Sequence, residues 1–451
     1  MSRLFSAIRQ AAHRIKRRHQ RRSVSALLRP TTFSAQFQSD AAFARDYLPR
    51  LEKNLIENIA GFWYPRCLDL ANGGYTINAG PQGQAQGPGT KAIVSQSRTV
   101  WFFARMARAG YRSEEYLAAA DHGYRFLRAK LWDARHGGFF WEVDAVGDHP
   151  LRRGKHLYGQ AFALYALSEY YLAGGQREVL DFAVALFDLI EAKAHDRKYG
   201  GYVEFFAEDW SAAPTDEAPY VGGGTGFKLM NTHLHLLEAI TTFYRAGQLS
   251  SARERLAELL SIASSAVIRK RLGAGTDNYE RDWTPRLDQH YAQVSYGHDL
   301  ENIWLSIDAC DALGVSPYPF LDLYRTLFDY ALKYGFDARR GGFYHTGPPN
   351  RRATDRNKIW WVQAETSVSA LYLYRLTGEE KYRATFAKTY DFIERQQVDW
   401  QYGEWHHTIT PGGQARGDKA SVWKSPYHNS RAMLECLQLL RQLARAGGER
   451  P

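Results

Sequence analysis

A turn of two glycines followed by an aromatic residue recurs along this 451-residue chain, and its spacing constrains the fold more than any other feature. Full copies of the turn occur at 73–75, 137–139, 200–202 and 341–343, and weaker copies lie near Gly275 and Gly403. The intervals between successive copies are 64, 63, 75, 66 and 62 residues. Six units of this length predict a closed array of structural repeats.

Between these turns, apolar residues recur at i, i+3, i+4 and i+7, which is the spacing of helices. Segment 158–171 is apolar on several faces, as an inner helix would be, whereas 176–194 carries charge along one side, as an outer helix would. We therefore expect an all-α fold, an (α/α)6 barrel with six inner helices, six outer helices and short β-hairpins. The pattern predicts helices at 41–60, 94–109, 114–131, 156–174, 176–194, 229–247, 252–270, 295–313, 317–336, 358–377, 380–396 and 428–446.

The basic character of the chain is confined to its N-terminal end. Residues 1–39 hold nine Lys and Arg residues and no acid, so of the net charge of +10 only about +1 belongs to the other 412 residues. This distribution does not indicate a nucleic-acid enzyme. We expect residues 1–39 to be a disordered extension and residues 40–451 to form one domain. The extension could be an arm for anionic partners, a transit-like presequence, the product of an upstream start codon, or a tail without function.

The three cysteines, Cys67, Cys310 and Cys436, form no CxxC motif. Their spacing indicates neither a zinc site nor a disulfide framework, and it favours a reducing compartment. No apolar run approaches the ~20 residues that a membrane span requires. We therefore expect a cytoplasmic protein without membrane association, either a monomer or a homodimer. Aromatic residues make up 14% of the chain, which suits sugar binding, but composition alone favours a large helical core as the explanation.

Unusual polar residues lie near the start of every second predicted helix. In a barrel of alternating antiparallel helices these ends meet at one mouth, where helix N-termini also favour a developing negative charge. The sequence therefore predicts one pocket that gathers Arg98, Tyr158, Asn231, His235, Glu238, His298, Glu301, Trp360, Glu365 and His428.

The histidines of this set also have ordinary structural interpretations. His298 precedes Glu301 by three residues, and His235 precedes Glu238 by three, so each pair shares a helical face and could form a local hydrogen bond. A His/Glu set on helices can also bind a metal, but no HExxH motif is present. His428 could simply cap its helix.

Arg98 lies in an otherwise apolar helix, where a buried guanidinium needs an acidic partner or a ligand. A functional interpretation is therefore favoured for this residue. Trp423 precedes His428 by five residues and is the better candidate for stacking on a sugar ring. His406 and His407 are expected in a turn at another face.

The strings SYGHDLE, NTHLHLLE, WWVQAE and WKSPYHN resemble the N-acylglucosamine 2-epimerase superfamily, most closely its cellobiose 2-epimerase branch. The resemblance covers residues 45–445 with the same order of motifs, and it implies the (α/α)6 barrel that the repeat predicts. The chain departs at Ser425 and Ser430, where the cellobiose enzymes usually have Cys and Gly. These differences leave the acid/base groups untouched but leave the substrate open.

The resemblance also implies roles for individual residues. His298 and His428 match the two histidines that exchange the C2 proton of a sugar, and His235 matches a third histidine of the site. Arg98 matches the arginine at the C1 and C2 oxygens, and Glu301 matches the acid that supports His298. The implied contacts to the sugar are Tyr158, Asn231, Glu238, Trp361 and Trp423.

Inversion at C2 requires ring opening, an enediolate, and a base and an acid on its two faces. Two imidazoles suit both roles because their ordinary pKa is near ~6.5. We therefore expect a sugar 2-epimerase that uses no metal, nicotinamide or other cofactor and whose partner is a small sugar. Its substrate could be cellobiose, a related β-1,4-disaccharide, mannose or glucose.

Three other functions remain open on the sequence. An aldose–ketose isomerase would use the same enediolate and return the proton to C1. A glycoside hydrolase on the same barrel would need two facing carboxylates, whereas the convergent groups here are mainly histidines. A sugar-binding protein without activity would need the aromatic residues, but not three histidines and an arginine at one mouth.

Overall fold

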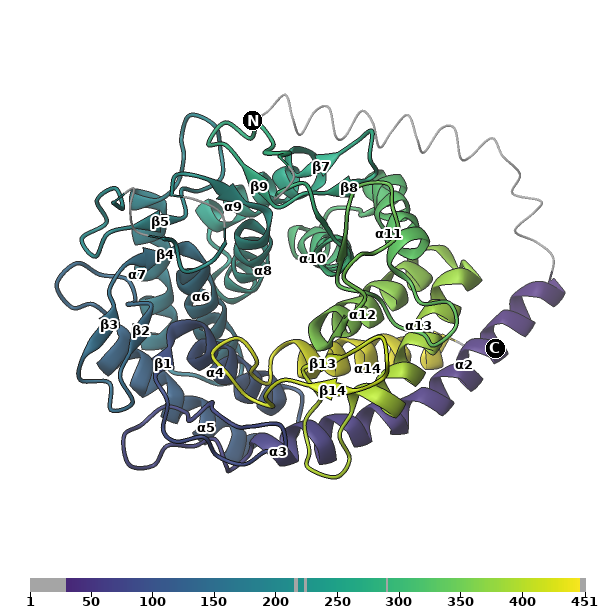
Figure 1. Ribbon diagram of the computed structural model, residues 1–451, viewed down its shortest axis with the longest axis horizontal. Helices are drawn as coiled ribbons and strands as arrows, with labels where there is room; N and C mark the ends of the chain where they lie inside the picture. Colours follow the sequence, from purple (N-terminus) through teal and green to yellow (C-terminus); the bar gives the residue numbers. More distant parts are fainter. Residues whose placement is uncertain (1–29, 215–217, 223–224, 289–290, 447–451) are drawn as a thin grey trace.

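The computed structural model describes residues 30–214, 218–222, 225–288 and 291–446, and side chains from residue 40 onward. Within these ranges the chain forms twelve helices of at least 12 residues, which confirms the all-α class. Six of them alternate along the chain with the other six and lie nearest the centre of Figure 1. The inner six are α4 (Ile93–Arg108), α6 (Leu157–Leu172), α8 (Met230–Gly247), α10 (Tyr296–Leu313), α12 (Trp360–Thr377) and α14 (His428–Ala446).

The other six helices lie outside the inner ones (Figure 1). They are α2 (Pro30–Lys53), α5 (Ser113–Phe126), α7 (Arg177–Lys193), α9 (Ser250–Ser261), α11 (Leu321–Gly335) and α13 (Glu380–Phe392). Four of them continue into a π-helical turn, at Asn54–Ala60, Leu127–Leu131, Ile262–Ala266 and Ile393–Gln397. A short α3 (Gly61–Trp63) and a 3-10 turn at Tyr318–Phe320 complete the helices.

Neighbouring inner helices pack in sequence order from α4 to α14, and each outer helix packs on an inner one. The first outer helix, α2, packs on the last inner helix, α14. Side chains also join α14 to α4, because Arg105 Nη2 lies 3.4 Å from Glu435 Oε1. The core between the two layers is a single apolar cluster that extends over all six repeats.

Short antiparallel strands connect neighbouring repeats. A strand that leads into an inner helix pairs with a strand after the next glycine turn, as in β1–β2, β4–β5, β6–β9, β10–β11 and β12–β13. The strands are β1 (Lys91–Ala92), β2 (Glu142–Val143), β3 (Pro150–Arg152), β4 (Lys155–His156), β5 (Phe205–Phe206), β6 (Lys228–Leu229), β7 (Ile268–Arg269), β8 (Ala274–Gly275), β9 (Asn278–Tyr279), β10 (Val294–Ser295), β11 (Thr346–Gly347), β12 (Lys358–Ile359), β13 (Thr408–Ile409) and β14 (Ala415–Arg416).

Each full glycine turn is held by a polar side chain from the first turns of an inner helix. Gln363 of α12 accepts a hydrogen bond from Phe343 N at 2.7 Å and donates one to Phe343 O at 2.7 Å. Gly342 has a φ of +78°, and a Cβ there would lie 2.7 Å from Gln363 Oε1, so the position requires glycine. Equivalent contacts join Gln96 to Tyr75, Gln160 to Phe139 and His233 to Tyr202.

A buried lysine just before the inner helix neutralises an aspartate at the start of the same turn. Lys358 Nζ lies 2.9 Å from Asp337 Oδ2 and donates to Gly341 O at 2.6 Å. The same pairing joins Lys91 to Asp69, Lys155 to Asp133 and Lys228 to Asp196. The stabilisation of these turns therefore accounts for the repeated residues, without any role in catalysis.

Two predicted boundaries differ from the structure. The helix expected at 41–60 begins at Pro30, so part of the expected extension belongs to α2, and residues 1–29 lie outside the described residues. The helix expected at 252–270 ends earlier, because the chain turns into β7 at Ile268. No described helix is long and apolar enough to cross a bilayer. The three cysteines are buried and unpaired.

Candidate active site

One pocket of about 310 Å³ lies among the N-terminal halves of the inner helices. The structure brings to it nine of the ten residues to which the family resemblance assigns roles: Arg98, Tyr158, Asn231, His235, His298, Glu301, Trp361, Trp423 and His428. Glu365, which was also expected in this pocket, is not among the lining residues. Tyr220, Val221, Gly222 and Trp360 complete the lining. The tenth residue, Glu238, does not line the pocket, so a direct contact between its carboxylate and a sugar is not supported.

His428 is the first residue of α14, and its ring is held by a carboxylate. Its Nδ1 lies 2.7 Å from Glu365 Oε1. Burial, together with the nearby Arg98 and Arg431, holds the pKa of His428 well below its usual value. A carboxylate at Nδ1 favours the tautomer with hydrogen on Nδ1, which leaves a lone pair on Nε2. The imidazole is therefore neutral, and its Nε2 is the atom that can accept a proton.

His298 lies in the first turn of α10 and has a different environment. Burial, and then the neighbouring His235 and His345, lower the pKa of His298 to about 3. Its Nδ1 has no hydrogen-bond partner among the described residues. The expected support from Glu301 therefore does not take the form of a hydrogen bond. The Trp361 ring packs against His298, with centroids 4.9 Å apart, and also against His428 at 5.8 Å.

His235 forms the local pair that its spacing predicts, with Nδ1 3.2 Å from Glu238 Oε2. Burial alone would raise the pKa of Glu238, but Arg431 and the bond from His235 lower it to about 2. Glu238 therefore stays ionised behind the pocket wall and orients the histidine.

Arg431, which sequence reasoning missed, joins the acids behind the pocket. Its Nη2 donates to Glu301 Oε1 at 2.7 Å and to Glu365 Oε1 at 2.8 Å, while Nη1 donates to Glu238 Oε1. It is fully buried, with 1% of its surface exposed. The signal that favoured Arg98, a cation inside an apolar helix, also exists in HNSRAMLE and would have found Arg431.

The acids of this network differ in their protonation. Burial, and then repulsion by Glu365, raises the pKa of Glu301 to about 7. Burial also raises the pKa of Glu365, although Arg431 opposes that change. Glu301 can therefore hold or release a proton near neutral pH.

Arg98 is also buried, but it lacks the neighbouring carboxylates that surround Arg431 in the described structure. Its Nη2 donates to the Tyr158 hydroxyl at 3.0 Å and its Nη1 donates to Trp423 O at 3.3 Å. The guanidinium rests over the Phe162 ring, 4.1 Å from its centroid. No carboxylate of the described chain lies within 4.0 Å of it. A buried cation without an acidic partner is suited to an anionic ligand or a developing oxyanion.

A metal site was not expected here, yet three possible ligand atoms lie close together. Atoms of Glu301, Glu365 and His428 lie within 4.8 Å of one another. The Arg431 guanidinium donates to both of these carboxylates and so supplies positive charge at that place. The donor set therefore fits a guanidinium, and the prediction that the protein uses no metal stays a prediction.

The mouth of the pocket is aromatic on one side. Trp423 is 41% exposed, and its ring centroid lies 6.1 Å from those of Trp141 and Tyr158. Deeper in the pocket, Asn231 Oδ1 is buried and has no hydrogen-bond partner within the described ranges. The wall thus offers an apolar platform outside and an unused acceptor inside. His406 and His407, which were expected at another face, are not among the lining residues.

Known proteins that resemble this chain include two named as sugar epimerases and one named as a sugar isomerase. The sequence profile of the N-acylglucosamine 2-epimerase (GlcNAc 2-epimerase) family matches residues 73–432. The chain is 30% identical over 390 residues to a cellobiose 2-epimerase of Bacteroides fragilis, covering 86% of this chain and 97% of the relative. It is 28% identical over 403 residues to a D-mannose isomerase of Marinomonas mediterranea, covering 85% and 96%. The solved cellobiose 2-epimerase of Spirochaeta thermophila superposes with a TM-score of 0.79 at 33% identity, covering 93% and 99%.

Proposed function

The chain belongs to the N-acylglucosamine 2-epimerase family, and we propose that it inverts the C2 configuration of a reducing-end aldose by proton exchange through an enediolate. The activity is that of a sugar 2-epimerase, an enzyme of the isomerase class. One observation carries the mechanism. Arg98 is buried in the same pocket as three histidines and has no acidic partner among the described residues, so the pocket holds proton acceptors beside an uncompensated cation.

In this mechanism the sugar ring opens, and the C1 aldehyde makes the C2 proton acidic. His428, neutral and held at Nδ1 by Glu365, removes the proton with Nε2. The free donors of Arg98 stabilise the negative oxygen of the enediolate. His298 returns a proton on the other face, and the two histidines exchange roles in the reverse reaction. The negative enediolate raises the pKa of both imidazoles above their values in the empty pocket, so that His298 can take from solvent the proton that it returns. His428 afterwards gives the C2 proton to solvent.

The substrate we propose is cellobiose or a related β-1,4-disaccharide. The second sugar of such a substrate would lie outside the C2 centre, where Trp423 presents an exposed indole face beside Trp141. The apolar face of a pyranose ring packs well on such a surface. Mannose or glucose would leave this surface unused, so the two substrate classes make different demands on Trp423.

We also propose that residues 40–451 form a single (α/α)6-barrel domain. Support comes from the alternation of inner and outer helices, from the contacts between consecutive inner helices, and from the ion pair between Arg105 and Glu435 that joins the last inner helix to the first. The shared apolar cluster also extends without interruption from Ala44 to Leu440.

The function is tested by incubating the purified protein in D2O with cellobiose, mannobiose and D-mannose in turn, and following the sugars by proton NMR. We expect the C2 epimer of a disaccharide, with deuterium at C2, and no reaction with the His428→Ala variant. A ketose product would instead assign an aldose–ketose isomerase, the activity named for the relative from Marinomonas mediterranea. Released monosaccharides would assign a hydrolase. No product and no exchange at C2 would refute the proposal.

A further inference from the structure

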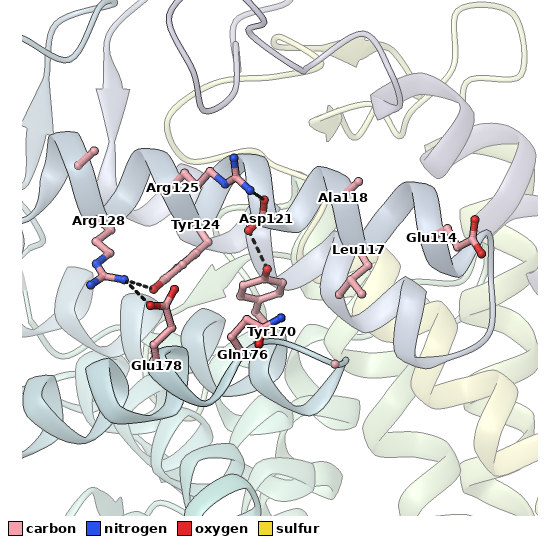
Figure 2. Close-up of a pocket in the computed structure, with 12 residues that line it drawn as sticks. Glu114, Leu117, Ala118, Asp121, Tyr124, Arg125, Arg128, Tyr170, Gln176 and Glu178 are labelled. Atoms are coloured by element: carbon pink, nitrogen blue, oxygen red, sulfur yellow. Dashed lines mark hydrogen bonds and ion pairs between the residues drawn. The ribbon is translucent and has the colours of Figure 1, made fainter.

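Two cavities of the outer layer, each more than twice the volume of the catalytic pocket, differ in the charge of their lining. One, of about 980 Å³, follows α5 (Figure 2). Its two arginines pair with carboxylates: Arg125 lies 2.7 Å from Asp121, Arg128 lies 3.4 Å from Glu178, and the Tyr170 hydroxyl donates to Asp121 at 2.9 Å. Glu114 also lines the cavity and forms no ion pair with a described residue. The lining therefore has an excess of negative charge, and this cavity does not favour an anionic ligand.

The second cavity, of about 720 Å³, contains an excess of positive charge. It lies between the glycine turn at 341–342, the C-terminal end of α13, and the loop that joins β13 to β14. We call it the arginine cavity, and its charged lining residues are Arg339, Arg340, Arg356, Lys358, Arg395 and Asp337. Since Lys358 and Asp337 neutralise each other, four arginines remain.

These arginines have no acidic partner, because the nearby carboxylates bind other groups. None of the four lies within 4.0 Å of a carboxylate in the described part of the chain. The neighbouring acids are engaged elsewhere, Asp355 by His345, and both Asp391 and Glu394 by Arg50.

Most of the hydrogen-bond donors of these arginines are also unused. A guanidinium has five N–H donors. Arg340 uses one of them for Pro411 O at 2.6 Å, and Arg395 uses one for Asp391 O at 2.9 Å. Arg356 makes one long bond to Ala353 O at 3.4 Å. The side chain of Arg339 makes no hydrogen bond to any described residue. The cavity thus offers charge and donors together.

The internal repeat shows that the fold does not require arginine at 339 and 340. Arg339 and Arg340 contribute only backbone N–H groups to their turn, each donating to Asp337 Oδ1 at 3.1 Å. The equivalent pairs in four other repeats are Ala71 with Asn72, Arg135 with His136, Lys198 with Tyr199, and Gln401 with Tyr402. The paired arginines therefore need an explanation other than the turn.

We propose that the arginine cavity is a second ligand site, which binds the phosphate groups of a small molecule. Arginine forks match phosphate oxygens with paired, charge-assisted hydrogen bonds. The cavity volume lies within the roughly 300–1,000 Å³ of small-molecule pockets. The four arginines line one cavity, which favours a small molecule over a polymer. No lining residue is shared with the catalytic pocket, so the site is separate.

The test is isothermal titration calorimetry of the full chain with sodium pyrophosphate, with sodium chloride adjusted to keep the ionic strength constant. The double variant Arg339→Gln, Arg395→Gln removes two of the cations and keeps the bond from Arg340 to Pro411. Arg135→Gln is the matched control, since Arg135 follows Asp133 as Arg339 follows Asp337. Circular dichroism spectra identical to those of the wild type establish that each variant is folded.

We expect pyrophosphate to bind once per chain to the wild type and to Arg135→Gln with equal affinity. The double variant should bind at least tenfold more weakly. Absence of binding to the wild type would overturn the proposal, as would an equal loss of affinity in Arg135→Gln. Tighter binding of a heparin oligosaccharide at the same arginines would also overturn it, because that result would indicate a surface for acidic polymers.

Discussion

Replacement of Arg431 by methionine tests whether one buried guanidinium maintains the whole acid network behind the pocket. The side chain contacts Glu301 at 2.7 Å and Glu365 at 2.8 Å, and it also donates to Glu238. Methionine is similar in length and leaves three buried carboxyl groups without their cation. Removal of one partner from a buried ion pair costs about 3–5 kcal/mol of stability. We expect a loss of at least that size at neutral pH.

The loss should depend on pH. Without Arg431 the carboxyl groups have a higher pKa in the folded protein than in the unfolded chain, where Glu has an ordinary pKa of ~4.3. Stability from such groups is fully present below the unfolded pKa and is lost as the pH rises through the folded pKa. Glu301 already has a folded pKa of about 7. The difference in stability between wild type and Arg431→Met should therefore be smaller at pH 5 than at pH 8.

Urea unfolding followed by circular dichroism measures this difference at the two pH values. Arg441→Met is the matched control, since Arg441 lies on the same helix, is 45% exposed and has only surface partners among the described residues, Glu52 and the Tyr111 hydroxyl. That control should lose less than about 1 kcal/mol. A loss below about 1 kcal/mol in Arg431→Met, or the same loss at both pH values, would refute the reasoning.

Three further predictions concern catalysis. In Arg98→Met we expect kcat to fall about 100-fold or more, because the enediolate loses its cation. The urea midpoint should change little, since no described acid loses its partner, and a large loss of stability would contradict this account. Ionisation of Glu301 near pH 7 adds negative charge beside the enediolate, so kcat/KM of the wild type should fall above that pH. If kcat/KM of Glu301→Gln still falls there, Glu301 is not the group responsible. In Trp423→Ala we expect KM for cellobiose to rise about three- to tenfold, and an unchanged KM would exclude stacking on this indole.

The fold was predictable from the repeat because each copy of the repeat forms the same local structure, a glycine turn held by polar side chains. Gly342 cannot accept a Cβ beside Gln363, and Lys358 needs Asp337, so the same residues recur wherever the turn recurs. The weak copy at Gly275 also has a physical reason. There Asp299 holds the turn by accepting a hydrogen bond from Gly275 N at 2.8 Å, in place of the glutamine.

The sequence predicted which residues line the pocket better than it predicted which of their side chains bond to one another. Nine residues reach one pocket because alternate helices begin at the same end. The spacing of His298 and Glu301 suggests a local pair, but Glu301 binds Arg431, which comes 130 residues later in the chain. Helical spacing shows which residues share a face, and it cannot show that a distant guanidinium competes for the same carboxylate.

The two buried arginines of the site show how charge separates structural support from chemistry. Arg431 has three carboxylates around it, whereas Arg98 has none among the described residues. With Glu301 protonated, as its pKa of about 7 permits, two carboxylates balance two guanidinium groups and the empty site is close to neutral. A neutral sugar can therefore bind without a large electrostatic cost. In the proposed mechanism, the negative charge of the enediolate is balanced by the imidazolium that has just taken the C2 proton, and the unused donors of Arg98 stabilise the enediolate oxygen. The acids hold Arg431 and two histidines in place. In the proposed mechanism, the lack of an acid beside Arg98 among the described residues leaves its guanidinium available to the substrate.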